Sequence, residues 1–230
     1  MGLVESPGFQ FENSTWYWQM LRRAVERALE FPAVYSVNQF IGQATVRRYR
    51  QLLAEEVPCD ATTSMLDLGC GTGSTSRVVV GRYSGVDINP SYIETAQRRH
   101  PHAKFFQGDC SKLAFADGSF DLATSIATTH HLTDAELEAM TLEALRVVRP
   151  GAAFHIIDAI LPINRKAFAK EMFFRMDRGR FPRQLDELAG VVSRRADVVH
   201  RRVLTGPLHD VAYLRIVSRD AQRAPGTGPR

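Results

Sequence analysis

The chain has 230 residues, a length that suits one domain with a full hydrophobic core, alone or with a small cap. Hydrophobic residues make up 44% and charged residues 23%, the balance of a soluble globular protein and not of a disordered or fibrous one. The net charge of +4 is too small an excess to indicate nucleic acid. No apolar run reaches the roughly 20 residues of a membrane-spanning helix, and residues 1–10 lack the pattern of a secretory signal.

The cysteines give little sign of disulfides or metal. Cys59, Cys70 and Cys110 are odd in number, and their spacing matches no zinc-binding pattern. This usage favours a reducing compartment, so we expect a cytoplasmic protein. His130, His131 and Asp158 could together hold a cation, but three candidates on two segments are weak evidence, and we predict no metal site.

Apolar residues recur at helical spacing near the start of the chain. Two amphipathic helices are predicted, over about 16–29 and 37–53, with Pro32 and Pro58 as their stops. Because both precede the first predicted strand, we assign residues 1–60 to an N-terminal helical cap. Residues 221–230, rich in proline and glycine towards their end, are expected to be a flexible tail.

From residue 63 the pattern alternates between strand and helix. Strands are predicted over 64–68, 84–88, 103–107, 120–126 and 152–158. Helices are predicted over 74–80, from Asn89-Pro90 onward, and from a capping box at Thr133–Glu136. Such alternation predicts a mostly parallel sheet with helices on both faces.

The end of the chain departs from this alternation. Apolar side chains at helical spacing predict helices near 168–176 and 185–192, and strands follow over 197–204 and 209–217. A hairpin there leaves the last strand antiparallel. The expected fold is therefore α/β, a seven-stranded, mostly parallel, doubly wound sheet over residues 61–220, with a helical insert at 161–195 over the acceptor site.

A glycine-rich motif follows the first predicted strand. It spans Asp67–Gly73 (DLGCGTG), and a second acid, Asp87, ends the next predicted strand. Glycines at a strand-to-helix turn let the backbone touch a ligand, and an acid about 20 residues further on suits ribose hydroxyls. Ser74 stands where a nicotinamide-binding motif has its third glycine, and Asp67 would repel a pyrophosphate. The motif therefore favours S-adenosylmethionine, which has a positive end and no phosphate.

This motif resembles the first motif of the class I, Rossmann-like S-adenosylmethionine-dependent methyltransferases, and the chain is similar to their small-molecule type. Further segments resemble the later motifs of this family in order and spacing: Gly85–Ile88, Gly108–Cys110, Phe120–Leu132 and Arg149–Gly151. The resemblance covers about residues 63–160 and implies S-adenosylmethionine as cofactor.

The resemblance also implies a role for each matched residue. Asp67 would hold the methionine ammonium, Asp87 both ribose hydroxyls, and Ile88 the adenine face. Asp109 would accept from the adenine amine, and the Cys110 amide would serve a ring nitrogen. The full set predicted to bind the cofactor is Asp67, Gly69, Cys70, Gly71, Asp87, Ile88, Asp109, Cys110 and Ser125, the last through its backbone.

Two adjacent histidines follow the fourth predicted strand. In the sugar O-methyltransferases that this segment resembles, a histidine in the place of His131 pairs with an acid at the end of the fifth strand, here Asp158. Because those strand ends are neighbours in the expected sheet, His131 with Asp158 is the candidate general base, and His130 is the second candidate. An enzyme without a side-chain base stays open, because methyl transfer chiefly needs alignment.

We therefore predict a methyltransferase acting on a small molecule, with O-methylation of a sugar or natural-product hydroxyl favoured. N-, C- or carboxylate methylation by the same fold is an alternative, and a protein that binds the cofactor without turnover is the non-enzyme rival. A nucleic-acid substrate is not expected, since the chain has no Asn/Asp-Pro-Pro-aromatic tetrad. A homodimer stays open. Four arginines would grip an acceptor carboxylate or phosphate, or lie in solvent: Arg175, Arg178, Arg180 and Arg183.

Overall fold

The computed structural model describes residues 45–162, 180–206 and 209–219. All of them belong to one compact unit, residues 43–230. The predicted helices near 16–29 and 168–176, the greater part of the predicted cap and the predicted tail lie outside the described residues.

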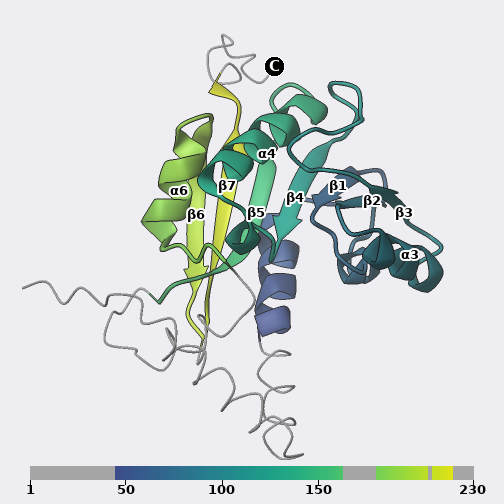
Figure 1. Cartoon of the computed structure of the whole chain (residues 1–230), viewed down its shortest axis with the longest axis horizontal. Helices are drawn as coiled ribbons and strands as arrows, with labels where there is room; N and C mark the ends of the chain where they lie inside the picture. The colour runs from purple at the N-terminus through teal and green to yellow at the C-terminus, as the bar shows by residue number, and fades with distance from the viewer. Residues whose placement is uncertain (1–44, 163–179, 207–208, 220–230) are drawn as a thin grey trace, which may run out of the picture. The chain divides into compact units, whose positions relative to one another are not determined.

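The described residues form one seven-stranded sheet (Figure 1). The strands lie in the order β3-β2-β1-β4-β5-β7-β6, and β7 runs antiparallel to both of its neighbours. The predicted topology is thus confirmed. The strand bounds are β1 Ser64–Leu68, β2 Arg82–Asp87, β3 Lys104–Gln107, β4 Leu122–Ile126, β5 Phe154–Ile160, β6 Asp197–Leu204 and β7 Asp210–Val217.

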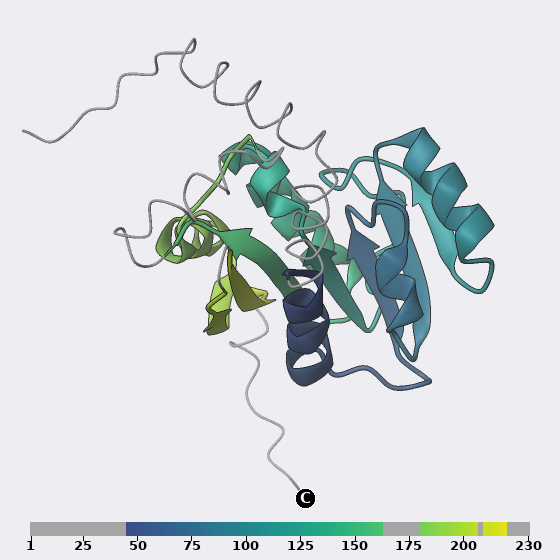
Figure 2. The same ribbon diagram turned by 90° about the horizontal axis from the view of Figure 1, so that it is seen from below.

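Helices pack on both faces of this sheet. The helices α4 (Asp134–Val147) and α6 (Leu185–Ser193) share one hydrophobic core with the sheet. The helix over residues 45–56 and α3 (Pro90–Arg99) share a second core. Figure 2 shows α4 and the helix over 45–56 on either side of the strands. The apolar stripes that predicted these helices are therefore the surfaces that they bury.

Local sequence signals set where two helices begin. The Asn89 side chain accepts a hydrogen bond from the Ser91 amide, and Pro90 occupies the first turn of α3, where its missing N–H costs nothing. The Thr133–Glu136 capping box is formed reciprocally at the start of α4. This second helix start fixes the end of the loop that carries His130 and His131.

The predicted helix over 74–80 is wrong in type and length. The structure has a single 3-10 turn, η1, over Ser74–Arg77. The Ser76 hydroxyl donates to the Gly73 carbonyl at 2.7 Å, so the side chain competes for a backbone acceptor. Three valines at 78–80 then follow, and β-branched residues gain little from a helix.

The strand order creates a crevice at the carboxyl ends of β1 and β4. These strands are neighbours, but the chain leaves β1 towards β2 and leaves β4 towards β5. Loops that diverge from adjacent parallel strands leave an opening between them, the usual ligand position in doubly wound sheets. The glycine motif follows β1, and the two histidines follow β4.

Candidate functional site

The glycine motif forms a tight turn at the carboxyl end of β1. The amides of Gly69 and Cys70 both donate to the Val86 carbonyl, at 2.8 and 3.0 Å, which ties the loop to β2. Gly69 has φ +76°, and a Cβ there would lie 2.3 Å from the Thr128 side chain. Gly71 has φ +54°, and a Cβ there would meet nothing within 4 Å. The first glycine is thus required by the protein's own packing, whereas the second borders open space.

Asp87 lies beside this loop at the end of β2. One carboxylate oxygen accepts from the Gly71 amide and the other from the Asn89 amide, both at 2.9 Å. Each oxygen of a carboxylate can accept two hydrogen bonds, so both retain capacity. Next to it, Ile88 is 70% exposed and Phe106 is 40% exposed. The arrangement offers a braced acceptor beside an apolar surface, which suits a sugar joined to a flat ring.

Asp67 lies beneath the loop and is almost fully buried, with 1% of its surface exposed. The Tyr83 hydroxyl donates to one carboxylate oxygen at 2.5 Å, and the Thr124 hydroxyl donates to the other at 3.0 Å. Burial raises the pKa of the carboxyl to about 6, although these hydrogen bonds oppose the rise. A cation placed above Asp67 would favour its ionised form.

A cavity of about 270 Å³ opens over Asp67 and the glycine loop. One wall comes from the helix over 45–56, and the others come from the loop, η1 and the end of β4. The helix residues that line it are Val46, Tyr49, Arg50 and Leu53. None of the four was predicted to line a site, because an amphipathic pattern does not say which apolar side chains border a ligand and which fill the core.

The end of β4 completes the cavity with an unusual backbone. Ala127 has φ +56°, in the left-handed region that residues other than glycine rarely adopt, and it lines the cavity together with Ile126. Its amide donates to the Ile157 carbonyl at 2.9 Å, which holds the conformation in place. Backbone strain of this kind gathers at ligand sites, because the surrounding structure must compensate for it.

Of the remaining residues predicted to bind the cofactor, Cys70 lines the cavity, whereas Ser125, Asp109 and Cys110 are not among its lining residues. Ser125 is fully buried, and its hydroxyl donates to the Leu68 carbonyl at 3.1 Å, so its side chain joins β4 to β1. Asp109 is exposed, with one oxygen bonded to the amide and hydroxyl of Ser111. Burial raises the pKa of the Cys110 thiol to about 12 and that of Cys70 well above its usual value. Both thiols are therefore protonated and unreactive near neutral pH.

Asp158 lies fully buried within β5, and the imidazole that contacts it is that of His130. The ring Nδ1 of His130 lies 2.7 Å from one carboxylate oxygen, and the Thr129 hydroxyl donates to the other at 2.5 Å. The amides of His130 and Ala159 also donate to the carboxylate. Burial raises the pKa of Asp158, but the positive charge that His130 carries when protonated and these hydrogen bonds outweigh it, and the pKa is lowered.

The predicted pairing of His131 with Asp158 is therefore corrected to His130 with Asp158. Both histidines lie in a 3-10 turn, η2 (Thr129–His131), in which successive side chains point about 120° apart. The turn directs His130 towards β5 and leaves His131 exposed, with ring centroids 4.2 Å apart. Asp158 is also two residues short of the strand end, because β5 extends to Ile160 by pairing with β7.

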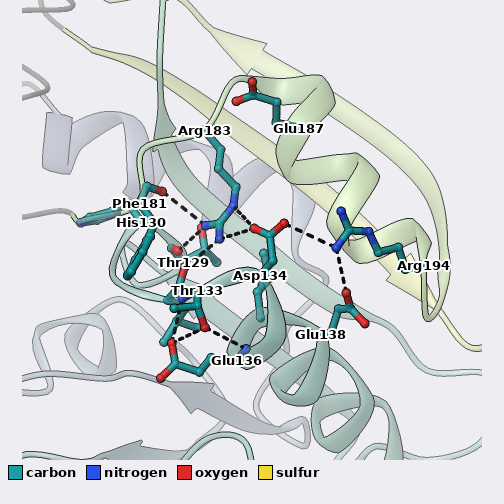
Figure 3. A network of polar contacts seen from close by, with 12 residues as sticks. Thr129, His130, Thr133, Asp134, Glu136, Glu138, Phe181, Arg183, Glu187 and Arg194 are labelled. Carbon is teal, nitrogen blue, oxygen red and sulfur yellow. Dashed lines mark hydrogen bonds and ion pairs between the residues drawn. The ribbon is translucent and has the colours of Figure 1, made fainter. Parts of the chain in front are cut away.

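Of the arginines near the expected acceptor site, Arg183 is neither in solvent nor directed at a ligand. It is 8% exposed and donates to carbonyl groups of the loop that contains η2, as Figure 3 shows. Arg180 is exposed, and Arg175 and Arg178 lie outside the described residues.

Comparison with known families identifies the central part of the chain. Residues 65–151 match the model of a methyltransferase domain, and this span runs from β1 to the turn before β5. Residues 65–151 form a class I S-adenosylmethionine-dependent methyltransferase domain. The methyl donor of this domain is S-adenosylmethionine.

Relatives of this methyltransferase domain include enzymes named for a hydroquinone and for a sterol. A 2-methyl-6-phytyl-1,4-hydroquinone methyltransferase from Synechocystis is 37% identical over 42% of this chain and 32% of its own length. A sterol 24-C-methyltransferase from Gibberella zeae is 29% identical over 50% of this chain and 33% of its own length. The alignments thus span about a third of these relatives.

The fold of the methyltransferase domain recurs in solved structures. The YcgJ protein of Bacillus subtilis superposes with a TM-score of 0.60 at 17% identity, covering 75% of this chain and 99% of that protein. Identity at this level supports the fold alone.

The described residues fit the methyl donor of this domain. Gly71 leaves open space where a side chain would stand, and Asp87 is a braced acceptor beside it. Asp67 supplies a buried acid under the cavity. Among the described residues, no group of three or more metal-ligating side chains gathers. Nor is any described helix long and apolar enough to cross a membrane.

The two glycines should respond differently to alanine. In Gly71→Ala, the positive φ costs about 1–2 kcal/mol of stability, and the new methyl group enters the open space where the cofactor would lie. We expect a modest loss of stability and a large loss of affinity for S-adenosylhomocysteine. In Gly69→Ala, the clash with Thr128 should lower stability further. Denaturant unfolding measures the effect on stability, and titration calorimetry measures the effect on affinity. If Gly71→Ala loses no more free energy of binding than free energy of unfolding, the assignment of Gly71 to the cofactor site is contradicted.

Proposed function

We propose that this protein transfers the methyl group of S-adenosylmethionine to a hydroxyl group of a small molecule, with His130 as the general base. The observation that carries the proposal is the contact of His130 with the buried, ionised Asp158 next to the crevice. A histidine oriented by a carboxylate is a common arrangement for removing a proton from a hydroxyl group. His131, on the same turn, is the second candidate for this role.

The cofactor would lie across the carboxyl ends of β1 and β2. Asp87 would accept both ribose hydroxyls, and exposed Ile88 would cover one adenine face. Asp67 would face the methionine ammonium, either directly or through water, and Arg50 would face the methionine carboxylate from the opposite wall. Asp109 and the Cys110 amide would bind the adenine edge, and the Ser125 backbone would bound the methionine side. These are the roles that the resemblance to class I methyltransferases implies, except that of Arg50, which is proposed from its place in the cavity wall and its charge.

The proton transfer follows from the hydrogen bonding of His130. An ionised carboxylate only accepts hydrogen bonds, so Nδ1 of His130 must carry the proton that faces Asp158. The neutral ring then has its lone pair on Nε2. Nε2 would take the proton of the acceptor hydroxyl as the oxygen attacks the methyl carbon. S-adenosylmethionine would supply the methyl group, and the electron pair of the broken methyl–sulfur bond would stay on the sulfur of S-adenosylhomocysteine. Asp158 stabilises the imidazolium that forms.

The acceptor is proposed to be a phenol or hydroquinone type of small molecule. The proposal draws on the relative named for a hydroquinone. Removal of a phenolic proton by His130 would raise electron density on the oxygen and on the ring carbons beside it. Methylation at such a ring carbon is therefore the second candidate, and the name of the sterol 24-C-methyltransferase also favours transfer to carbon.

The test is a turnover assay with a set of hydroquinones, phenols, sterols and sugars. S-adenosylmethionine with a trideuterated methyl group labels the product, and mass spectrometry with NMR distinguishes an O–CD₃ from a C–CD₃ group. Production of S-adenosylhomocysteine together with an O-methyl product is the expected result. A C-methyl product favours the second candidate. Cofactor binding by calorimetry without turnover on any acceptor in the set would favour the non-enzyme rival.

A further inference from the structure

Arg183 holds both ends of the turn that carries the two histidines. Its Nη1 donates to the Thr129 carbonyl at 2.9 Å, and its Nη2 donates to the Leu132 carbonyl at 2.7 Å. Thr129 and Leu132 are the residues on either side of His130 and His131. Figure 3 shows the guanidinium between this turn and the start of α4. A single side chain thus fixes the span of backbone from which His130 projects.

The backbone next to Arg183 is hydrogen-bonded to both segments that carry the histidine–aspartate pair. The Phe181 amide donates to the His130 carbonyl at 2.9 Å. The Leu161 amide, which directly follows β5, donates to the Arg183 carbonyl at 2.9 Å. The segment over residues 180–183 therefore bridges the turn that carries His130 and the strand that carries Asp158. Any movement of this segment changes the separation of the two.

The contacts of Arg183 use the shape of the guanidinium as well as its charge. Besides the carbonyls of Thr129 and Leu132, it donates to the Phe181 carbonyl and twice to the Asp134 carboxylate, at 2.8 and 3.2 Å. Five N–H groups in a rigid plane make this set possible, whereas a lysine offers three donors on one atom. Burying a cation is costly, and Asp134 at the first turn of α4 offsets that cost.

We propose that Arg183 is a positioning residue that sets the geometry of His130 against Asp158. This inference rests on the proposed function in one respect only, the role of His130 as base. Arg183 acts through the loop backbone and the 180–183 segment. It holds the His130 Nδ1 at hydrogen-bond distance from the carboxylate, and so keeps the lone pair of Nε2 in one direction. Misplacement of a base by about 1 Å can cost on the order of 100-fold in rate.

The test compares Arg183→Lys with a matched control, Arg194→Met. Arg194 also pairs with Asp134, at 3.4 Å, but it is exposed, and its other contact in Figure 3 is Glu138. The control therefore removes an ion pair from Asp134 while leaving the loop carbonyls bonded. The first readout is the NMR signal of the His130 Nδ1–H proton, identified by its loss in His130→Gln. In Arg183→Lys we expect this signal to shift and to exchange faster with water; in Arg194→Met we expect no change.

Three further readouts separate positioning from general stability. Amide hydrogen exchange should rise at 129–132 and at Phe181 in Arg183→Lys, and not in β1. The affinity for S-adenosylhomocysteine should stay within about two-fold of the native value. With an acceptor found in the turnover assay, kcat should fall about 10- to 100-fold at nearly constant KM for the cofactor.

The inference is overturned if Arg183→Lys and Arg194→Met keep the same His130 signal, or if exchange in Arg183→Lys rises uniformly through the sheet. Failure of the proposed function looks different. If the proposed function is wrong, His130→Gln retains turnover, while in the protein that keeps His130 the signal of its Nδ1–H proton still depends on Arg183.

Discussion

Replacement of His130 by glutamine is expected to reduce kcat by about 10²- to 10⁴-fold, the range for loss of a general base. Glutamine keeps a polar side chain of similar length beside Asp158 but has no basic nitrogen. Cofactor binding should be nearly unchanged, since the cavity residues come from other segments. Single-turnover rates with the acceptor found in the assay, and calorimetry with S-adenosylhomocysteine, measure the two quantities separately.

His131→Ala is the matched control for this experiment. His131 lies in the same turn but is exposed and is not the ring that contacts Asp158, so its loss should change kcat by less than about ten-fold. Asp158→Asn should reduce kcat as His130→Gln does. The asparagine amide can donate to Nδ1, which favours the tautomer that carries its proton on Nε2 and so removes the lone pair of the proposed base. A large loss in His131→Ala with little change in His130→Gln would restore the pairing expected from the sequence. Small effects in all three variants would indicate methyl transfer without a side-chain base.

Replacement of Asp87 by alanine is expected to lower the affinity for S-adenosylhomocysteine by about 10²- to 10⁴-fold. Hydrogen bonds to a charged group contribute about 1.5–3 kcal/mol each, and the proposed contacts with the ribose number two. Every 1.4 kcal/mol corresponds to about ten-fold in affinity. Alanine also removes the acceptor of the Gly71 amide, so the glycine loop loses its brace at the same time. Titration calorimetry gives the dissociation constants directly.

The control for Asp87 is a second carboxylate at the same site. Asp109 is exposed and is expected to contact only the adenine amine, so Asp109→Ala should cost about ten-fold. Asp87→Asn should fall between the two, since its amide keeps one accepting oxygen. If 5′-methylthioadenosine, which retains the ribose and adenine, binds equally well to native protein and Asp87→Ala, the ribose assignment is wrong. Thermal unfolding of each variant confirms that affinity is measured on folded protein.

Much of the fold was predictable because its signals are local. Alternating strand and helix patterns predict a doubly wound sheet, and the Thr133–Glu136 capping box marks the start of α4 to the residue. The error at η1 has a local cause as well. The hydroxyl of Ser76 and the valines after Arg77 disfavour a helix, although the spacing of apolar residues over 74–80 resembles that of a helix. The extension of β5 to Ile160 could not be predicted, because it depends on pairing with β7 about 50 residues later.

The residues proposed to bind the cofactor could be predicted from the sequence, because their chemistry is carried by backbone and by short spacings. A positive φ at Gly69 and Gly71 and an acid at the end of each of two adjacent strands follow from residue type and order alone. Only the tertiary structure decided which histidine pairs with Asp158 at the proposed acceptor side. Which of two consecutive histidines faces Asp158 depends on the direction of one 3-10 turn, and that turn is held by Arg183, some 50 residues away in the chain. Side-chain direction in such a turn is set by long-range contacts, and sequence spacing does not encode them.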